Sequence, residues 1–153
     1  MSRTKQKSMS PFIVPEVRRT SEVVFHHDVA PGLRFLAIDG SKYPGSPIYI
    51  AVRRVAKVAQ SQPEYIDWHK HTVDSLYLFI GEGEAMKGLH AVVRLGDDER
   101  QIESPMTVFI PKGTPHSYKL TKGSGTYISI LLAGDYNGST LPAEAVVKVA
   151  AES

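Results

Sequence analysis

The sequence has no cysteine among its 153 residues. This absence excludes disulfide bonds, thiolate nucleophiles, zinc–cysteine sites and cysteine-held iron–sulfur clusters. Long apolar runs are also missing, since no stretch reaches the roughly 18 apolar residues that a membrane span needs. The basic start is not followed by the apolar segment of a signal peptide. We therefore expect a soluble, cytoplasmic protein with no membrane partner.

An excess of charge of either sign is absent as well. The chain carries 18 basic and 16 acidic residues, a formal net charge of +2. Three of the basic residues, Arg3, Lys5 and Lys7, lie close to the start. So balanced a charge does not favour a nucleic-acid partner. The composition, 42% hydrophobic and 22% charged, is typical of a globular protein, and the length suits one domain.

Short runs of β-branched and aromatic residues alternate with glycine and proline turns along most of the chain. This pattern predicts an all-β sandwich or barrel. Residues 122–125, Lys-Gly-Ser-Gly, are expected to turn the chain between two strands. The strongest strand signals lie at residues 33–38, 48–58, 65–71, 76–80, 91–95, 106–110 and 127–132.

The ends of the chain differ from this pattern. Residues 1–11 predict a flexible basic arm, residues 12–141 a single barrel, and residues 142–153 a tail or a short helix that Pro142 would begin. Residues 12–14, a short apolar segment between prolines, are expected at an edge. They could exchange between two subunits, so we expect a homodimer.

Histidines provide the clearest chemical signal. His69 and His71 are two residues apart, and alternate residues of a β-strand point to the same face. Asp74 follows shortly after, and His116 ends a tight turn at residues 111–116. Three imidazoles and one carboxylate form a ligand set for a divalent transition metal. Such a set suits Fe(II), Mn(II), Ni(II), Co(II) or Zn(II).

Two motifs in the same stretches resemble those of the cupin superfamily. The first cupin motif is His-x-His, then an acidic residue and a glycine turn, matched here by His69, His71 and residues 81–83. The second is Pro-x-Gly-x-x-His, matched by Pro111, Gly113 and His116. The resemblance covers roughly residues 45–133.

This resemblance implies a double-stranded β-helix, or jelly-roll, barrel that holds a metal inside. Its ligands would be His69, His71, Asp74 and His116. Asp74 is assigned to the glutamate position of the family because it lies seven residues before Gly81. It departs from the motif in being an aspartate and in following His71 after only two residues.

Two further residues are candidates for contact with a small-molecule substrate. Tyr118 lies two residues after His116 and is expected on the same face. One of Arg53 and Arg54 should point inward by alternation, and Arg53 is our candidate for pairing with a substrate carboxylate. Tyr65 and Asp67 share the face of His69 by the same alternation.

Several functions stay open at this stage. The resemblance implies an enzyme that coordinates a small carboxylate- or carbonyl-bearing substrate to the metal. A dioxygenase that uses Fe(II) is slightly favoured over an isomerase, a cyclase or a decarboxylase. A non-catalytic module that binds a small ligand is a further alternative, because a fold alone does not determine a reaction.

Overall fold

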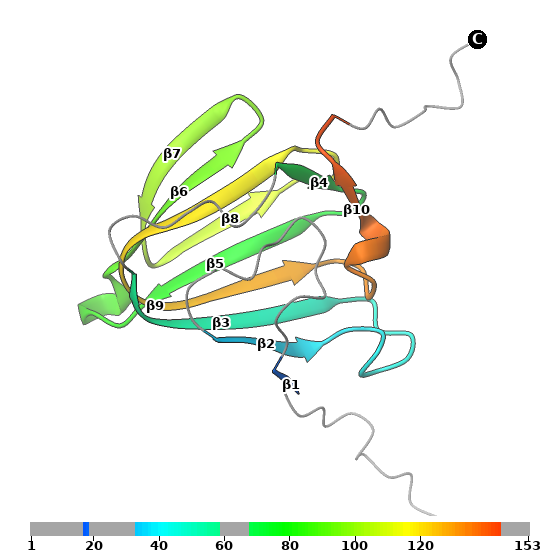
Figure 1. Ribbon diagram of the computed structural model, residues 1–153, viewed down its shortest axis with the longest axis horizontal. Coiled ribbons are helices and arrows are strands. Elements are labelled where there is room, and N and C mark those ends of the chain that lie inside the picture. The colour runs from blue at the N-terminus through cyan, green and yellow to red at the C-terminus, as the bar shows by residue number, and fades with distance from the viewer. Residues whose placement is uncertain (1–16, 19–32, 59–67, 145–153) are drawn as a thin grey trace, which may run out of the picture.

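Antiparallel β-strands make up most of the computed structural model, which describes residues 17–18, 33–58 and 68–144 (Figure 1). The predicted arm, the segment at residues 12–14, Tyr65, Asp67 and residues 145–153 lie outside the described residues. No helix in the described ranges is long and apolar enough to cross a membrane. The strands are β1 (Val17–Arg18), β2 (Leu33–Ile38), β3 (Tyr49–Val58), β4 (His69–His71), β5 (Ser75–Gly81), β6 (Leu89–Leu95), β7 (Asp98–Glu103), β8 (Met106–Ile110), β9 (His116–Leu131) and β10 (Thr140–Pro142).

The strands follow the alternation expected from the sequence. In β5, Tyr77 and Phe79 are buried, whereas Leu76 and Leu78 between them are only partly buried. Successive side chains of a strand point to opposite faces, so one face of β5 faces the interior. The boundaries of β2 and β8 are those predicted. Two short 3-10 turns, Glu84–Met86 and Asn137–Ser139, join strands.

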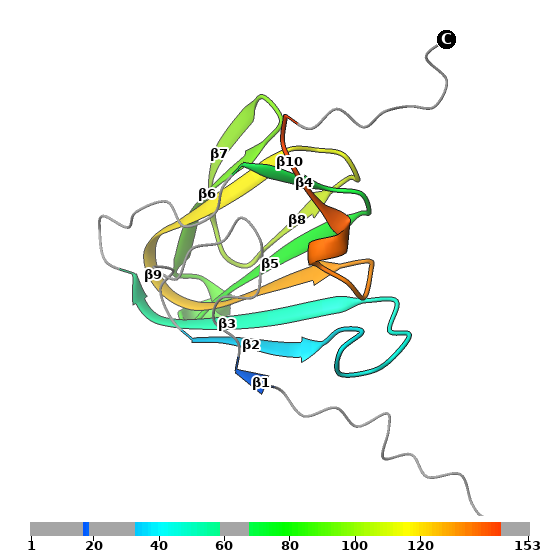
Figure 2. The same cartoon turned by 45° about the vertical axis from the view of Figure 1, so that its right-hand side comes forward.

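The ten described strands form one hydrogen-bonded sheet, and the long strand β9 joins its two halves, here called the first and second sheets, which curl around one interior (Figures 1 and 2). Its first part pairs with β6 and, at His116, with β4. Its last part pairs with β3 on one side and β5 on the other. Strands β2 and β8 extend this second sheet, whereas β7 extends the first from β6 and β10 from β4. The predicted all-β jelly-roll barrel is confirmed.

The turn predicted at residues 122–125 is wrong, because β9 runs without interruption through them. The glycines allow neighbouring strands to approach this bend closely instead of reversing the chain. A Cβ at Gly123 would lie 1.6 Å from the backbone oxygen of Gly88, and one at Gly125 would lie 2.2 Å from that of Ile80. Gly123 also has φ +93°, in the left-handed region that favours glycine.

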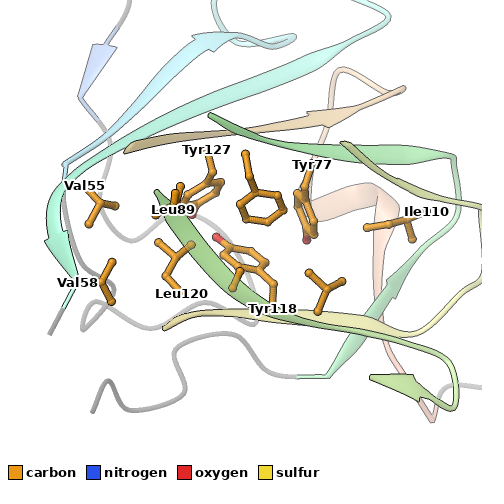
Figure 3. Packing of buried hydrophobic residues seen from close by; sticks show 11 residues of the cluster. Val55, Val58, Tyr77, Leu89, Ile110, Tyr118, Leu120 and Tyr127 are labelled. Atoms are coloured by element: carbon orange, nitrogen blue, oxygen red, sulfur yellow. The ribbon is translucent and has the colours of Figure 1, made fainter. Parts of the chain in front are cut away.

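The main core fills the space between the sheets (Figure 3). Its aromatic members, Tyr77, Phe79, Tyr118 and Tyr127, come from β5 and β9 and contact one another edge to face or tilted. A second buried cluster near the other end of the barrel comprises Leu36, Tyr49, Ala51, Leu131 and Tyr136. The histidines of the two motifs lie beside these aromatic residues, as their ring contacts show.

We expect Gly123→Ala to destabilise the protein by roughly 3 kcal/mol or more, because its Cβ would overlap a backbone atom that cannot rotate away. Gly96→Ala is the matched control. Gly96 also has a positive φ, +55°, but open space surrounds it, so that variant should lose only about 1–2 kcal/mol from backbone strain. Urea unfolding of both variants measures the difference. Equal losses would contradict the close approach of β9 to Gly88.

Candidate metal centre and adjoining cavity

Three histidines converge at the join between β4 and β9. His69 and His71 share the inward face of β4, and Lys70 between them points the other way. His116 is the first residue of β9 and lies directly opposite His69 in the strand register. The two motifs explain these positions. The His-x-His motif places two histidines at alternate residues of β4, and the last histidine of the second motif begins the neighbouring strand β9.

The turn at residues 111–116 fixes the third histidine. Gly113 has φ +78°, which glycine adopts without strain, and its N–H donates a hydrogen bond to the carbonyl oxygen of His71 at 2.7 Å. The N–H of Thr114 donates to the carbonyl oxygen of Pro111 at 3.1 Å. These backbone bonds attach the turn to the end of β4, so His116 enters β9 beside the first pair.

The three imidazoles are buried and close together. The exposed fractions are 0% for His69, 3% for His71 and 0% for His116. One ring nitrogen from each lies within 4.8 Å of those of the other two, and the ring centroids are 4.4–5.0 Å apart. This group could hold a metal ion.

Hydrogen bonds set the tautomers of two of these rings. The Thr140 hydroxyl donates to the carbonyl oxygen of Tyr136, so its oxygen accepts from Nδ1–H of His71 at 2.9 Å. Nδ1–H of His116 donates to the carbonyl oxygen of Thr114 at 2.9 Å. In each ring the lone pair is then on Nε2, the arrangement found in histidines that bind metals through Nε2.

His116 offers the most direct support for a metal ligand. Its Nε2 is buried and has no hydrogen-bond partner in the described part of the chain. The pKa of His116 is lowered from 6.5 to about 3, mainly because burial disfavours the charged ring and secondly because His69 repels it. The hydrogen bond to Thr114 has a smaller, opposite effect. The ring is therefore neutral at physiological pH, which is the form that coordinates a metal.

Asp74, the fourth predicted ligand, is not in the histidine group. Its Oδ1 accepts a hydrogen bond from the backbone N–H of Lys112 at 2.8 Å, and its carbonyl oxygen accepts from the N–H of Leu132 at 3.1 Å. The carboxylate thus supports the turn that carries His116.

Tyr136 and Thr140, which the sequence analysis did not select, complete the surroundings of the histidines. The Tyr136 hydroxyl is 3.5 Å from Nε2 of His69, and its ring centroid is 5.1 Å from that of His71. Burial is the first cause that raises the pKa of Tyr136 well above its usual value, so the hydroxyl keeps its proton. Both residues lie more than 60 positions from the His-x-His motif, and no local motif marks them.

A cavity adjoins this group. It has an empty volume of about 320 Å³, including the part open to solvent. No histidine of the described residues lines it, but Tyr136, whose hydroxyl lies 3.5 Å from Nε2 of His69, is part of its wall. The other charged and aromatic residues that line the cavity are Arg34, Tyr49, Arg53, Tyr77, Tyr118 and Tyr127.

The structure places both predicted substrate-contacting residues on this cavity. Arg53 points inward, and its Nε donates to the Tyr127 hydroxyl at 3.0 Å. Arg54 points outward and pairs with Glu82. Tyr118 is buried between Tyr77 and Tyr127, with ring centroids 4.9 Å from each (Figure 3). Neither Arg53 nor Tyr118 belongs to the histidine group itself.

Comparison with known proteins supports the fold. No family model matches the chain, and no curated protein sequence matches it significantly. Among solved structures, oxalate decarboxylase from Bacillus subtilis at pH 4.6 is similar at a TM-score of 0.53 and 15% identity, covering 83% of this chain and 31% of that one. A variant of the same enzyme gives a TM-score of 0.52 at 15% identity, with coverages of 83% and 32%.

A DMSP lyase structure is similar at a TM-score of 0.48 and 17% identity, covering 72% of this chain and 51% of that one. The chain spans about a third of the length of the oxalate decarboxylases. These decarboxylases have the cupin fold, so the cupin fold implied by the two motifs is confirmed for this chain.

Acid should destabilise the metal-free protein through His116. Above pH 6.5 its imidazole is neutral whether the chain is folded or not, but between pH 6.5 and about 3 only the unfolded chain takes up the proton. The free energy of unfolding should then fall by up to ~1.4 kcal/mol per pH unit from this one residue. Urea unfolding at several pH values, for wild type and His116→Gln, measures this. An unchanged pH slope in His116→Gln would contradict the expectation.

Proposed function

We propose that the chain is an enzyme that binds a small carbonyl- or carboxylate-bearing compound at a divalent transition metal and oxidises it with dioxygen. The observation that carries the proposal is the convergence of three buried imidazoles close to a cavity, with the pKa of His116 lowered by burial. The Nε2 atom of His116 supports a metal, because it is buried without a hydrogen-bond partner among the described residues, which is costly.

The proposed metal is Fe(II), because reaction with dioxygen needs a redox-active ion. His69, His71 and His116 would hold the ion, and Zn(II), Mn(II), Ni(II) and Co(II) are alternatives with the same ligand preference. Three protein ligands without Asp74 leave more coordination positions than four would, as a reaction that brings substrate and dioxygen together requires. The metal would supply Lewis acidity and, as Fe(II), the redox capacity for reaction with dioxygen.

The protein supplies position and proton control around the substrate. Tyr136 keeps a protonated hydroxyl close to His69, so it can donate a hydrogen bond to a substrate oxygen. Thr140 orients His71 by accepting its Nδ1–H. The Tyr118 ring forms part of the cavity wall and excludes water from the reacting centre.

A non-oxidative reaction is the second candidate. The Tyr136 hydroxyl, 3.5 Å from Nε2 of His69, can stabilise negative charge that develops on a substrate oxygen in an isomerase, a cyclase or a decarboxylase. Decarboxylation of a small acid is also the activity named for the oxalate decarboxylases of similar fold. A non-catalytic ligand-binding module is the third reading. The homodimer stays a prediction.

The first test of this proposal is metal binding. The purified protein should bind close to one equivalent of Zn(II) or Fe(II), and His71→Ala should lose it. Thr140→Val should weaken binding roughly 10–100-fold, because Thr140 sets the His71 tautomer. Elemental analysis and competition with a chromophoric chelator measure both effects.

Two control variants make the metal test specific. Asp74→Asn and His90→Ala should bind metal like wild type, since neither residue is in the histidine group. Full retention of metal by a variant with His69, His71 and His116 all changed to alanine would contradict the site.

The choice between oxidative and non-oxidative chemistry is tested with oxygen. The Fe(II)-loaded protein should consume oxygen in step with the loss of its substrate, in a screen of small 2-oxo acids, hydroxy acids and dicarbonyl compounds. His71→Ala should abolish this consumption. Equal conversion under strict anaerobic conditions would contradict the oxygenase and support an isomerase, a cyclase or a decarboxylase.

A further inference from the structure

Two arginines lie side by side in the wall of the cavity. Arg34 of β2 and Arg53 of β3 are direct partners in the antiparallel register. Directly opposite residues of an antiparallel pair project from the same face. Their exposed fractions are only 8% and 7%, and both line the cavity. Arginine is seldom buried to this extent unless it pairs with something.

Tyrosine hydroxyls hold both guanidiniums in place. Nη2 of Arg34 donates to the Tyr49 hydroxyl at 2.9 Å, and Nε of Arg53 donates to the Tyr127 hydroxyl at 3.0 Å. Among the described residues, the Arg34 side chain forms one hydrogen bond, to Tyr49, and no ion pair. A guanidinium has five N–H donors, so Arg34 keeps donors for a ligand.

We propose that Arg34 and Arg53 form an anion subsite in this cavity and bind a carboxylate group of the substrate. Two adjacent positive charges in a buried wall repel each other, and an anion between them removes that cost. The planar fork of a guanidinium matches the two oxygens of a carboxylate. The small cavity favours a short carboxylic acid over a bulky phosphate ester.

Two tyrosines connect this subsite to the histidine group. Tyr49, which accepts from Arg34, packs against Tyr136 with ring centroids 4.9 Å apart. The Tyr136 hydroxyl in turn lies 3.5 Å from Nε2 of His69. This inference rests on the proposed metal-dependent function and extends it. One end of a small acid binds at the arginines, and the reacting end faces the histidines.

Binding of malonate to the metal-free protein tests the subsite separately from the metal. Titration calorimetry after removal of metal by chelation should detect malonate but not malonamide, its neutral analogue of similar size. Arg34→Met and Arg53→Met should each weaken malonate binding at least about tenfold, the loss of one charge-assisted hydrogen-bonded contact. Arg54→Met is the matched control and should bind like wild type, because Arg54 points outward and pairs with Glu82.

Other outcomes would overturn the proposal. No malonate binding by wild type, equal binding of malonamide, or unchanged affinity in Arg34→Met would each do so, and tighter binding of inorganic phosphate would overturn the choice of carboxylate. If Arg34→Met does not fold, Arg34→Lys gives the answer, because it keeps the charge but loses the fork and should still weaken malonate binding. Malonate binding without any metal binding would leave the subsite intact and contradict only the metal-dependent function.

Discussion

The pairing of β9 with strands of both sheets is the constraint on which the site depends. One end of β9 lies against β4 and β6, and the other lies between β3 and β5. Because a single strand belongs to both sheets, their separation and register are fixed together. His116 then meets His69 at the start of β9, and Tyr118 and Tyr127 project into the same interior.

The site joins two kinds of buried polar group that bound ions would stabilise. The histidine group has an imidazole nitrogen without a partner in the described residues, and the arginine pair places two positive charges in an enclosed wall. In the proposed function, a cation at the first and an anion at the second would offset these costs. The complementary charges would also define an orientation for a small acid between them. Tyr136 stands between the two groups and keeps its proton, so it adds a hydrogen-bond donor without adding charge.

Local patterns were sufficient to predict much of this arrangement. Strand alternation placed His69 and His71 on one face, and the proline–glycine turn placed His116 in reach of them. Alternation also required one of Arg53 and Arg54 to point inward, but only the pairing of β3 in the sheet identifies it as Arg53. The direction of a side chain was therefore predictable where residues close in the sequence determine it.

The remaining features depend on contacts between distant segments. Arg34, Tyr136 and Thr140 reach the site through strand pairing and loop packing, which leave no signal in the local sequence. Asp74 suited the family's glutamate position by counting, but its carboxylate accepts a hydrogen bond from the backbone of Lys112 and is not in the histidine group. Glycines at 123 and 125 resembled a turn because glycine marks both reversals and close backbone approaches.

X-ray absorption of the Zn(II)-loaded protein tests the central claim most directly, since it identifies the groups bound to the metal. The account predicts outer-shell scattering from three imidazoles, with the remaining positions filled by water or another small oxygen ligand. It also predicts that Asp74→Asn leaves the spectrum unchanged. A spectrum with no imidazole scattering, or one that does not change in His116→Ala, would contradict the account.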